Sequence, residues 1–324
     1  MSAASVPAPR PDGVPADWAG LLLVDKPTGV TSHDVVAMAR RALRIKAIGH
    51  LGTLDPNASG LLVLAVGVAT RCIRVWQGGA KTYAGTARFG VVTDSQDTQG
   101  AVLATSDARP DEAAVRAAAV RLTGDLQQVP PMVSALKHQG ERLYDLARRG
   151  EIVPREPRAI HVEAWRWKAF TADTADFEVD CSGGTYVRTL VHDLGAALGM
   201  GATLAALRRL HSDPFDVRDA CPASDLRERP AAEVLARAGR PLDRALDVLP
   251  AVVLTHAQAE AIGRGQSPRV TPGSARVGAG PCSVVLRDEA GRALALAHLE
   301  ASGEAAMAFP DVVFPWAVRE GRMA

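Results

Sequence analysis

Near its amino-terminal end the chain reads Gly49-His-Leu-Gly-Thr-Leu-Asp-Pro-Asn-Ala-Ser-Gly60, followed at once by the apolar run Leu61-Leu-Val-Leu-Ala-Val66. Glycine, proline, asparagine and serine between apolar segments predict a loop, and the apolar run predicts a buried strand. Asp55 therefore lies where a loop enters a rigid element, and Pro56 biases it towards an extended backbone. An aspartate in such a loop more often caps its own backbone than performs chemistry, so the loop alone defines no site.

Length and composition indicate a globular protein with more than one domain. A chain of 324 residues has room for two or three domains, and an apolar fraction of 47% is ordinary for sizeable cores. No apolar run reaches the roughly 18 to 20 residues that a membrane span requires. The four cysteines lie far apart, which favours neither a zinc site nor a disulfide framework and is typical of a cytoplasmic protein.

The net charge of +1 conceals a strongly basic segment. Between Gly20 and Gly90 nine lysines and arginines stand against three aspartates, whereas from Arg240 onwards nine arginines balance nine acidic residues. A local excess of positive charge favours a polyanionic partner such as RNA or DNA. A solvated basic face is the alternative. The position of Asp55, a carboxylate nearly alone among cations, favours the nucleic acid.

Hydrophobic periodicity predicts strands and helices on both sides of the loop. A helix begins at the N-cap hydroxyls of Thr31-Ser32 and continues to Leu43. Further strands are predicted at residues 20–25, 81–90, 161–165 and 177–181, and further helices at 110–123, 141–149, 187–198 and 204–210. In the last of these helices, Arg208 and Arg209 are expected to be exposed. Residues 91–105 predict a polar loop, and the proline-containing residues 214–250 predict a linker.

Arg188 lies in the first turn of the predicted helix 187–198. A cation there opposes the helix dipole, at a cost of about a few tenths of a kcal/mol. An ion pair with a nearby carboxylate would explain this placement. Beyond residue 251 the pattern changes to a short helix and strands separated by glycine-containing turns, which predicts a small, mostly-β domain.

Five blocks of sequence occur together in this chain. They are Val24-Asp-Lys-Pro-Thr-Gly-Val-Thr-Ser32, the loop Gly49 to Gly60, Lys81-Thr-Tyr83, Val129-Pro-Pro-Met-Val-Ser-Ala-Leu-Lys-His138, and Cys181-Ser-Gly-Gly-Thr-Tyr-Val-Arg-Thr-Leu190 followed by Leu207-Arg-Arg-Leu210. In this order and spacing they strongly resemble the TruB family of tRNA pseudouridine synthases. The resemblance covers roughly residues 20–210, and the tail from about residue 251 resembles, more weakly, the family's PUA-like domain.

The resemblance implies an α+β fold. We expect a mixed, mainly antiparallel sheet of the pseudouridine synthase type, flanked by helices and loops, with a small mostly-β PUA-like domain at the C-terminus. Residues 1–18, rich in proline and alanine and without the apolar core of a signal peptide, are expected to form a disordered extension. The catalytic domain is expected over residues 19–248, with an RNA-gripping insertion at about 125–160, and the RNA-binding PUA-like domain over 249–324.

The resemblance also implies an isomerase that converts uridine 55 in the T-loop of tRNA to pseudouridine. Such an enzyme breaks the N-glycosidic bond of the uridine, turns the freed base and rejoins it through carbon 5. Asp55 matches the family's essential aspartate, the nucleophile. Tyr83 matches the tyrosine that stacks on the flipped base and is proposed to take part in proton removal. Arg188 matches the arginine that pairs with the catalytic carboxylate.

Six further residues are expected to bind the substrate. They are His50, Tyr186 and Leu207, which match residues lining the site and contacting the flipped nucleotides, together with the basic residues Lys26, Lys137 and Arg208. The family uses no metal and no organic cofactor. The resemblance therefore implies one partner, the T-arm of tRNA, for a cytoplasmic, monomeric enzyme with no obligatory protein partner and no membrane association.

The residues considered alone agree with this chemistry. Cleavage of a uridine glycosidic bond needs a carboxylate, either as a nucleophile or to stabilise cationic character at the anomeric carbon. An adjacent arginine favours the ionised form of a carboxylate. A base within a folded RNA loop has to be extruded and stacked in a pocket, for which Tyr83, Leu207 and His50 are suitable. The basic segment supplies cations for the phosphates.

One departure and three alternative functions accompany this interpretation. Val133 stands where the family usually carries an aromatic residue. A non-catalytic tRNA-binding or folding protein would not require Asp55, Tyr83 and Arg188 together. A pseudouridine synthase acting on another RNA, with guide RNA and protein partners, is less favoured by the bacterial-looking order of the blocks. A glycosidase acting on free nucleosides usually uses two carboxylates, and the sequence offers no clear second one near Asp55.

Overall fold

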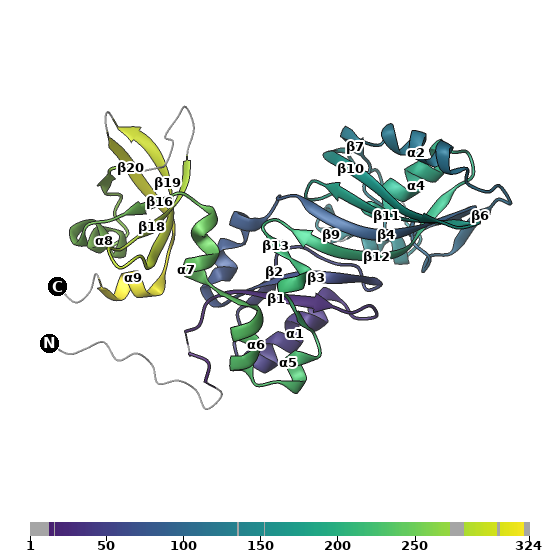
Figure 1. Cartoon of the computed structure of the whole chain (residues 1–324). Helices are drawn as coiled ribbons and strands as arrows, with labels where there is room; N and C mark the ends of the chain where they lie inside the picture. The colour runs from purple at the N-terminus through teal and green to yellow at the C-terminus, as the bar shows by residue number, and fades with distance from the viewer. Residues whose placement is uncertain are drawn as a thin grey trace.

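The computed structural model describes residues 13–320, apart from residues 16, 135, 152, 273–281 and 303–304. Most of the extension expected over residues 1–18 therefore lies outside the described residues. Figure 1 shows a body built around one long sheet, with a smaller C-terminal lobe beside it. No helix in the described part of the chain is long and apolar enough to cross a membrane.

The body contains an 11-stranded sheet. Most neighbouring strands are antiparallel, whereas β12 with β3 and β1 with β14 are parallel, so the mainly antiparallel α+β fold is confirmed. In spatial order the strands are β14 (Cys221–Pro222), β1 (Gly20–Lys26), β3 (Ala58–Val66), β12 (Ala202–Ser212), β4 (Lys81–Phe89), β11 (Thr174–Cys181), β10 (Arg158–Phe170) and β7 (Gly124–Gln128). Three more strands pair with β12, β3 and β1, namely β13 (Phe215–Asp216), β2 (Ile48–His50) and β15 (Gly239–Pro241).

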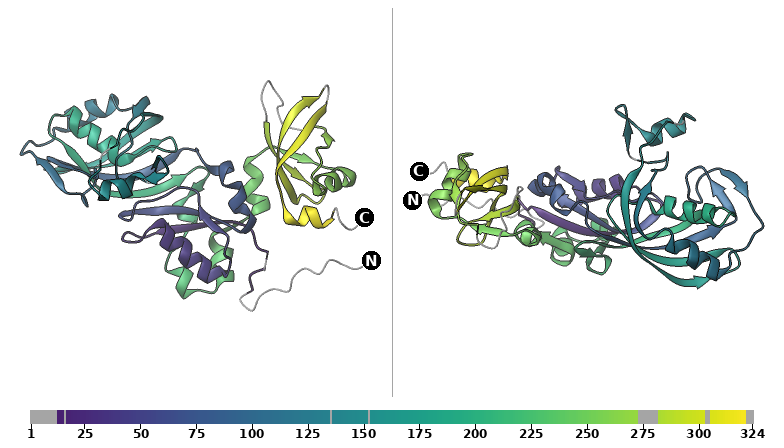
Figure 2. Two further views of the ribbon diagram at one scale, coloured as in Figure 1. Left: turned by 180° about the vertical axis from the view of Figure 1, so that it is seen from behind. Right: turned by 90° about the horizontal axis from the view of Figure 1, so that it is seen from above.

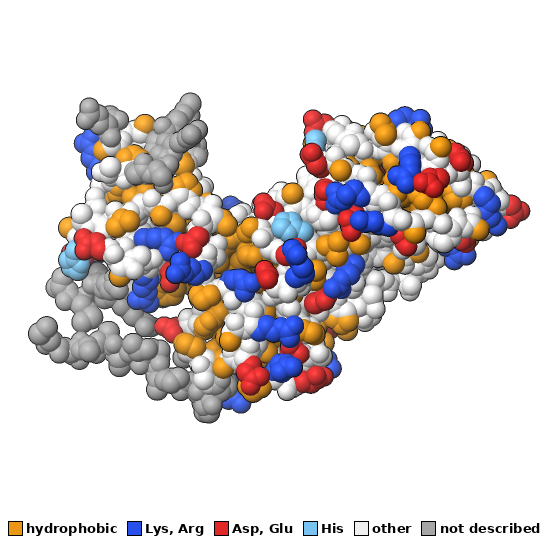
Figure 3. All heavy atoms as spheres, in the orientation of Figure 1, with side chains coloured by type: hydrophobic (Ala, Val, Ile, Leu, Met, Phe, Trp, Pro, Cys, Tyr) orange, Lys and Arg blue, Asp and Glu red, His pale blue; other side chains and the backbone are white. Residues whose placement is uncertain are grey.

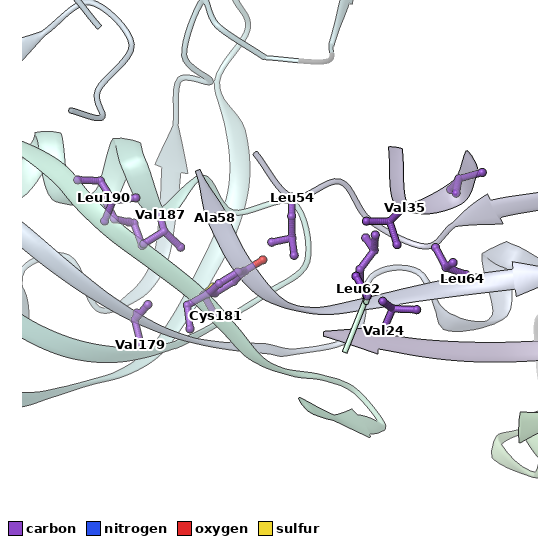
Figure 4. Close-up of a cluster of buried hydrophobic side chains, with 14 of the residues drawn as sticks. Val24, Val35, Leu54, Ala58, Leu62, Leu64, Val179, Cys181, Val187 and Leu190 are labelled. Atoms are coloured by element: carbon purple, nitrogen blue, oxygen red, sulfur yellow. The ribbon is translucent and has the colours of Figure 1, made fainter. Parts of the chain in front are cut away.

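Strands β1 and β3 are buried on both faces, which explains their continuous apolar runs. Side chains alternate along a strand, so Leu62 and Leu64 enter one core cluster, and Leu61 and Val63 enter a second on the other face. In the first cluster, Figure 4 shows Leu62 and Leu64 with Val35 of α1 (Ser32–Leu43). The predicted cap of α1 is confirmed: Thr31 accepts a hydrogen bond from the Asp34 backbone N–H, and Asp34 reciprocates.

Helices cover the sheet in two groups (Figure 1). One group lies by β1, and the other lies over the half of the sheet that contains β11 and β10. The first group is α1, α5 (Asp225–Glu228) and α6 (Ala231–Ala238), and the second is α2 (Glu112–Val120) and α4 (Val187–Ala197). The segment predicted as a linker, residues 214–250, supplies β13, β14, β15, α5, α6, α7 (Leu242–Ala245) and the turns η2 (Val217–Asp219) and η3 (Leu246–Val248). It is part of the body because two of its strands pair with β1.

The helix predicted over residues 204–210 is wrong, because these residues belong to strand β12. Leu204, Leu207 and Leu210 recur every third residue, which imitates one face of a helix. Strand β12 has register shifts between Leu204 and Ala206 and between Arg209 and His211. Each such irregularity interrupts the alternation of a strand, so a spacing of three is compatible with β12. Pairing with both β3 and β4 holds the segment extended. Arg209 is consequently buried rather than exposed.

Two hairpins extend from the body. Residues 91–105, predicted as a loop, form β5 (Val91–Thr93) and β6 (Val102–Thr105). The segment at which the RNA-gripping insertion was expected contains β8 (Lys137–His138), β9 (Glu141–Arg142) and α3 (Leu143–Arg148). Seen from above in Figure 2, the chain around α3 (teal) projects away from the sheet. The second hairpin can therefore contact a partner on the side of the sheet from which α3 projects.

The C-terminal lobe is mostly β, as predicted. Its five-stranded sheet contains β16 (Ala251–Val253), β18 (Cys282–Arg287), β19 (Ala293–Ser302), β20 (Ala305–Val313) and β17 (Arg269–Val270), with helices α8 (His256–Gly263) and α9 (Pro315–Glu320). The lobe has its own apolar core. It also packs against the body, because Phe314 and Leu296 share a buried cluster with Trp76 of η1 (Gly67–Trp76).

Candidate active site

The loop of residues 49–60 is held from beneath by buried groups. Leu54 is buried in the main core (Figure 4), and its backbone N–H and C=O both bond to the hydroxyl of Ser32, at 2.9 and 3.0 Å. The backbone N–H of Ala58 donates to the C=O of Asp55 at 3.0 Å, just as β3 begins. The Asp55 carboxylate is therefore placed at the surface by fixed neighbours, with 41% of its side chain exposed.

Arg188 pairs with Asp55, the partner that the resemblance to the TruB family implied. Its Nε lies 3.0 Å from Asp55 Oδ2, although its side chain is only 4% exposed. The rest of the guanidinium is occupied: Nη1 donates to the C=O of Ser95 and Nη2 to the C=O of Val133, each at 2.8 Å. Arg188 is thus anchored by two further chain segments. Anchoring of this kind restricts the orientations that the carboxylate can adopt.

A second carboxylate, that of Asp97, lies beside the Arg188 guanidinium. The sequence had offered no clear second carboxylate near Asp55. Asp97 Oδ2 is 3.7 Å from Arg188 Nη1, and both aspartates line one pocket. Asp97 Oδ1 accepts hydrogen bonds from Ser95 Oγ and the Gln99 backbone N–H, at 2.7 and 3.0 Å. Its segment was interpreted as a polar loop, because a short acidic stretch carries no local signal for a partner in a distant helix.

The pocket is shallow and lies between the Asp55 loop, the β5–β6 connection and β12. Its lining combines two carboxylates and one guanidinium with small and apolar side chains. The lining residues are Asp55, Asn57, Ala58, Asp97, Thr98, Arg188, Leu204, Ala205, Ala206 and Leu207. Leu207, predicted from sequence to contact a flipped nucleotide, is therefore placed at the pocket.

Tyr83 lies in β4 and is buried, with 7% of its surface exposed. Burial raises the pKa of its hydroxyl, and the nearby guanidinium of Arg209 partly opposes that shift. Tyr83 faces Arg209 across the β4–β12 pair. The phenol is accordingly neutral at pH 7 and stands beside a cation.

His50 and Tyr186 are not among the residues that line this pocket. His50 ends β2, and its ring meets that of His33 edge-on at 5.4 Å. Burial, followed by the charges of His33 and Arg209, lowers the pKa of His50, so its ring is neutral at pH 7. Tyr186 is the N-cap residue of α4. The side-chain amide of Gln128 accepts a hydrogen bond from the backbone N–H of Tyr186 at 2.8 Å and donates one to the backbone C=O of Tyr186 at 3.1 Å.

The three basic residues expected to bind the substrate differ in placement. Lys26 is fully buried, and its Nζ donates to the carbonyls of Pro27, Val30 and Pro56 at 2.9, 2.7 and 3.2 Å, so it supports the Asp55 loop instead of facing RNA. Desolvation by this burial lowers the pKa of Lys26 to about 8. Arg208 forms two hydrogen bonds to Asp25, at 2.9 and 2.7 Å. The side chain of Lys137 lies outside the described part of the structure.

The basic segment is mostly at the surface. Figure 3 shows lysines and arginines gathered over the middle of the body, among scattered acidic side chains. Seven of the nine basic residues between Gly20 and Gly90 are exposed, namely Arg40, Arg41, Arg44, Lys46, Arg71, Arg74 and Arg88. Among the described residues, no group of three or more His, Cys, Asp or Glu side chains could hold a metal ion.

The fold and the Asp55–Arg188 pair agree with the class of protein that the sequence predicted, and comparison with known proteins identifies the family. Residues 40–187 match the model of the TruB family pseudouridylate synthase N-terminal domain, and residues 188–247 match that of the tRNA pseudouridylate synthase B C-terminal domain. The chain belongs to the TruB family of pseudouridylate synthases.

Relatives named tRNA pseudouridine synthase B cover most of the chain. The protein of that name from Opitutus terrae is 49% identical over 67% of this chain and 91% of its own length. The one from Rhodopseudomonas palustris is 42% identical over 87% of this chain and 78% of its own. In fold, the chain is similar to a structure entitled Crystal Structure of a Cbf5-Nop10-Gar1 Complex, with a TM-score of 0.71, 24% identity, and coverage of 97% and 90% of the two chains.

Proposed function

We propose that this protein converts uridine 55 in the T-loop of tRNA to pseudouridine. The bond between ribose C1′ and uracil N1 breaks, and a bond between C1′ and C5 forms. The proton on C5 is lost and N1 gains one, so the composition of the RNA is unchanged. The observation that carries the proposal is the ion pair between Asp55 and Arg188 at 3.0 Å, at the edge of a pocket in a chain of the TruB family.

Each residue of the site has a role in this proposal. Asp55 is the nucleophile that opens the glycosidic bond. Arg188 orients the Asp55 carboxylate, and it does so without reorganisation because other segments already hold the guanidinium. Tyr83 stacks on the extruded base, a role that a neutral phenol can perform. Leu207, His50 and Tyr186 line the space around the flipped nucleotides.

The wider organisation follows from the same proposal. Residues 19–248 form the catalytic domain and residues 249–324 a PUA-like RNA-binding domain, with residues 1–18 as an extension. The T-arm lies across the basic surface of Arg40 to Arg74, contacts Arg208, and is gripped by the hairpin that includes Lys137. We propose that the enzyme acts as a cytoplasmic monomer without an obligatory protein partner, a metal or an organic cofactor.

The second carboxylate does not favour a nucleoside glycosidase. Such an enzyme would need Asp97 as a protonated acid or as a base that activates water. Instead, Asp97 Oδ1 accepts two hydrogen bonds and Oδ2 faces the Arg188 guanidinium. In this arrangement both oxygens of Asp97 are occupied, and the carboxylate helps to hold the arginine.

The test is pseudouridine mapping with the purified protein alone. The substrate is a T-arm stem-loop transcript, and a transcript with cytidine at position 55 is the control. We expect pseudouridine at position 55 only in the first. Absence of pseudouridine would refute the activity, and modification only after addition of a cell extract would refute the stand-alone mode. Mapping of total tRNA and ribosomal RNA from cells with and without the protein then tests the choice of RNA.

A further inference from the structure

Arg209 is a buried arginine that the proposed chemistry leaves without a role. Its neighbour on β12, Arg208, points the other way and pairs with Asp25 near the surface. Arg209 is 3% exposed, and within the described part of the chain it forms no ion pair with a carboxylate. Burial of a cation without a carboxylate costs free energy unless other polar groups compensate. The hydrogen bonds of the Arg209 guanidinium therefore indicate which part of the structure it stabilises.

Three hydrogen bonds of the Arg209 side chain go to backbone carbonyls on either side of Asp55. Nε donates to the C=O of Leu61 at 2.7 Å, Nη2 to that of Gly52 at 3.1 Å, and Nη1 to that of Thr53 at 3.5 Å. Gly52 and Thr53 precede Asp55 in the loop, and Leu61 follows it in β3. The planar, forked guanidinium thus ties the two arms of the loop to one point.

The backbone of Arg209 joins the same loop to Tyr83. Within the sheet, Arg209 is opposite Gly60 of β3 and opposite Tyr83 of β4. Gly60 has φ +98°, and a Cβ there would lie 2.2 Å from the Arg209 carbonyl oxygen. Only glycine allows β12 to approach this closely. One residue consequently contacts the loop that carries Asp55 through its side chain and the strand that carries Tyr83 through its backbone.

The charge of Arg209 also reaches the groups around the site. It contributes to lowering the pKa of His50, Lys26 and Lys81, and it opposes the effect of burial on the Tyr83 hydroxyl. Four titratable groups on three strands, β1, β2 and β4, thus respond to one guanidinium. Arg209 therefore both holds the Asp55 loop by hydrogen bonds and influences the pKa values of groups on β2 and β4.

We propose that Arg209 is a positioning residue that sets Asp55 and Tyr83 relative to each other for the isomerisation. This inference rests on the proposed function. Arg209 does not touch the substrate; it acts through the Gly52, Thr53 and Leu61 carbonyls and through β4. A displacement of about 1 Å in a reacting group can lower a rate by about 100-fold. Loss of the guanidinium is therefore expected to slow the chemical step while RNA binding remains.

The experiment compares Arg209→Lys and Arg209→Met with the wild type. Lysine retains the charge but not the fork, and methionine retains much of the apolar volume but neither charge nor donors. Arg287→Lys is the control for loss of a buried guanidinium. Arg287 donates to the backbone carbonyls of Gly291 and Asp243, pairs in addition with the Asp247 carboxylate at 2.8 Å, and lies in the C-terminal lobe. Thermal unfolding, RNA affinity and the single-turnover rate of pseudouridine formation are measured for each.

We expect folded Arg209→Lys to bind T-arm RNA within about twofold of the wild type and to react about 100-fold more slowly, with Arg209→Met slower still. Arg287→Lys should retain the wild-type single-turnover rate. If Arg209→Met does not fold, Arg209→Lys alone decides. A wild-type rate in folded Arg209→Lys, or equal losses of rate and affinity, would overturn the positioning role. An inactive wild type would refute the proposed function instead.

Discussion

Arg188 Nε lies 3.0 Å from Asp55 Oδ2, across 133 positions of sequence. The arginine is itself held by the Ser95 and Val133 carbonyls, so the carboxylate meets a donor that is already oriented. Preorganised groups of this kind contribute to catalysis because they need not reorganise as charge develops. Through Val133, Arg188 also connects the loop that carries Asp55 to the segment that precedes β8, the first strand of the second hairpin.

Asp55→Asn is expected to abolish turnover. Asparagine has nearly the same shape but is a poor nucleophile, so binding should remain largely intact while the glycosidic bond is not opened. Tritium release from 5-tritiated uridine in a T-arm RNA measures turnover, and filter binding measures affinity. Appreciable release by this variant would contradict the role of Asp55.

Arg188→Lys is expected to lower the rate much more than the RNA affinity. Lysine keeps the charge but lacks the planar fork, whose separate nitrogens reach Asp55, Ser95 and Val133 in the wild type. Loss of one preorganised donor typically lowers kcat by about 100- to 1,000-fold. Arg166→Lys is the control, since Arg166 pairs with Asp180 and Glu178 away from the pocket. Equal losses of rate and affinity in Arg188→Lys would reject the ion-pair role.

Asp97→Asn tests the second carboxylate. The amide oxygen can still accept from Ser95 and Gln99, but Arg188 loses one of its two negative neighbours. Removal of one partner of a buried charge pair is costly, so the single-turnover rate should fall by roughly 10-fold or more, with RNA affinity preserved. Circular dichroism verifies the fold. An unchanged rate would mean that the charge of Asp97 is not needed to hold Arg188 in its catalytic position.

Lys26→Met is expected to destabilise the protein in a pH-dependent way. The carbonyls of Pro27, Val30 and Pro56 lose their donor, at a cost of about 1 kcal/mol or more at pH 7. Burial lowers the pKa of Lys26 to about 8 from 10.5, so between these pH values the unfolded wild type binds more protons and the Lys26 contribution to stability rises with pH.

The difference in unfolding free energy between wild type and Lys26→Met should therefore grow from pH 8 to 10.5, as followed by denaturant titration. The exposed Lys46→Met serves as control and should leave stability unchanged at pH 7. A difference that shrinks as the pH rises would contradict the buried, charge-disfavouring environment of Lys26.

RNA binding is expected to weaken steeply with salt. Contacts with phosphates release counterions, so the logarithm of affinity should fall against the logarithm of salt concentration with a slope of roughly several units. Fluorescence anisotropy with a labelled T-arm measures this slope. Replacement of the exposed Arg41 by glutamine should reduce it by about one if that residue contacts a phosphate. A flat titration would argue against the basic surface.

Local elements were predictable where one physical signal dominates. The continuous apolar run before residue 66 indicated a buried strand, and the Thr31-Ser32 cap with its apolar stripe indicated α1. The first-turn cation at position 188 indicated an ion pair, and its partner came from the resemblance to the TruB family. By contrast, β12 was interpreted as a helix because its leucines recur every third residue, a spacing that the two register shifts make compatible with a strand.

The sequence by itself determined the loop, its aspartate, most strands and helices, and the basic character of the surrounding segment, because turn residues, periodicity and charge act over a few neighbouring positions. The tertiary structure alone decided which distant groups meet. It placed Asp97 beside Arg188, buried Lys26 and Arg209 beneath the Asp55 loop, and paired Arg208 with Asp25. These contacts depend on sheet order and register, which bring together residues whose local sequences contain no information about one another.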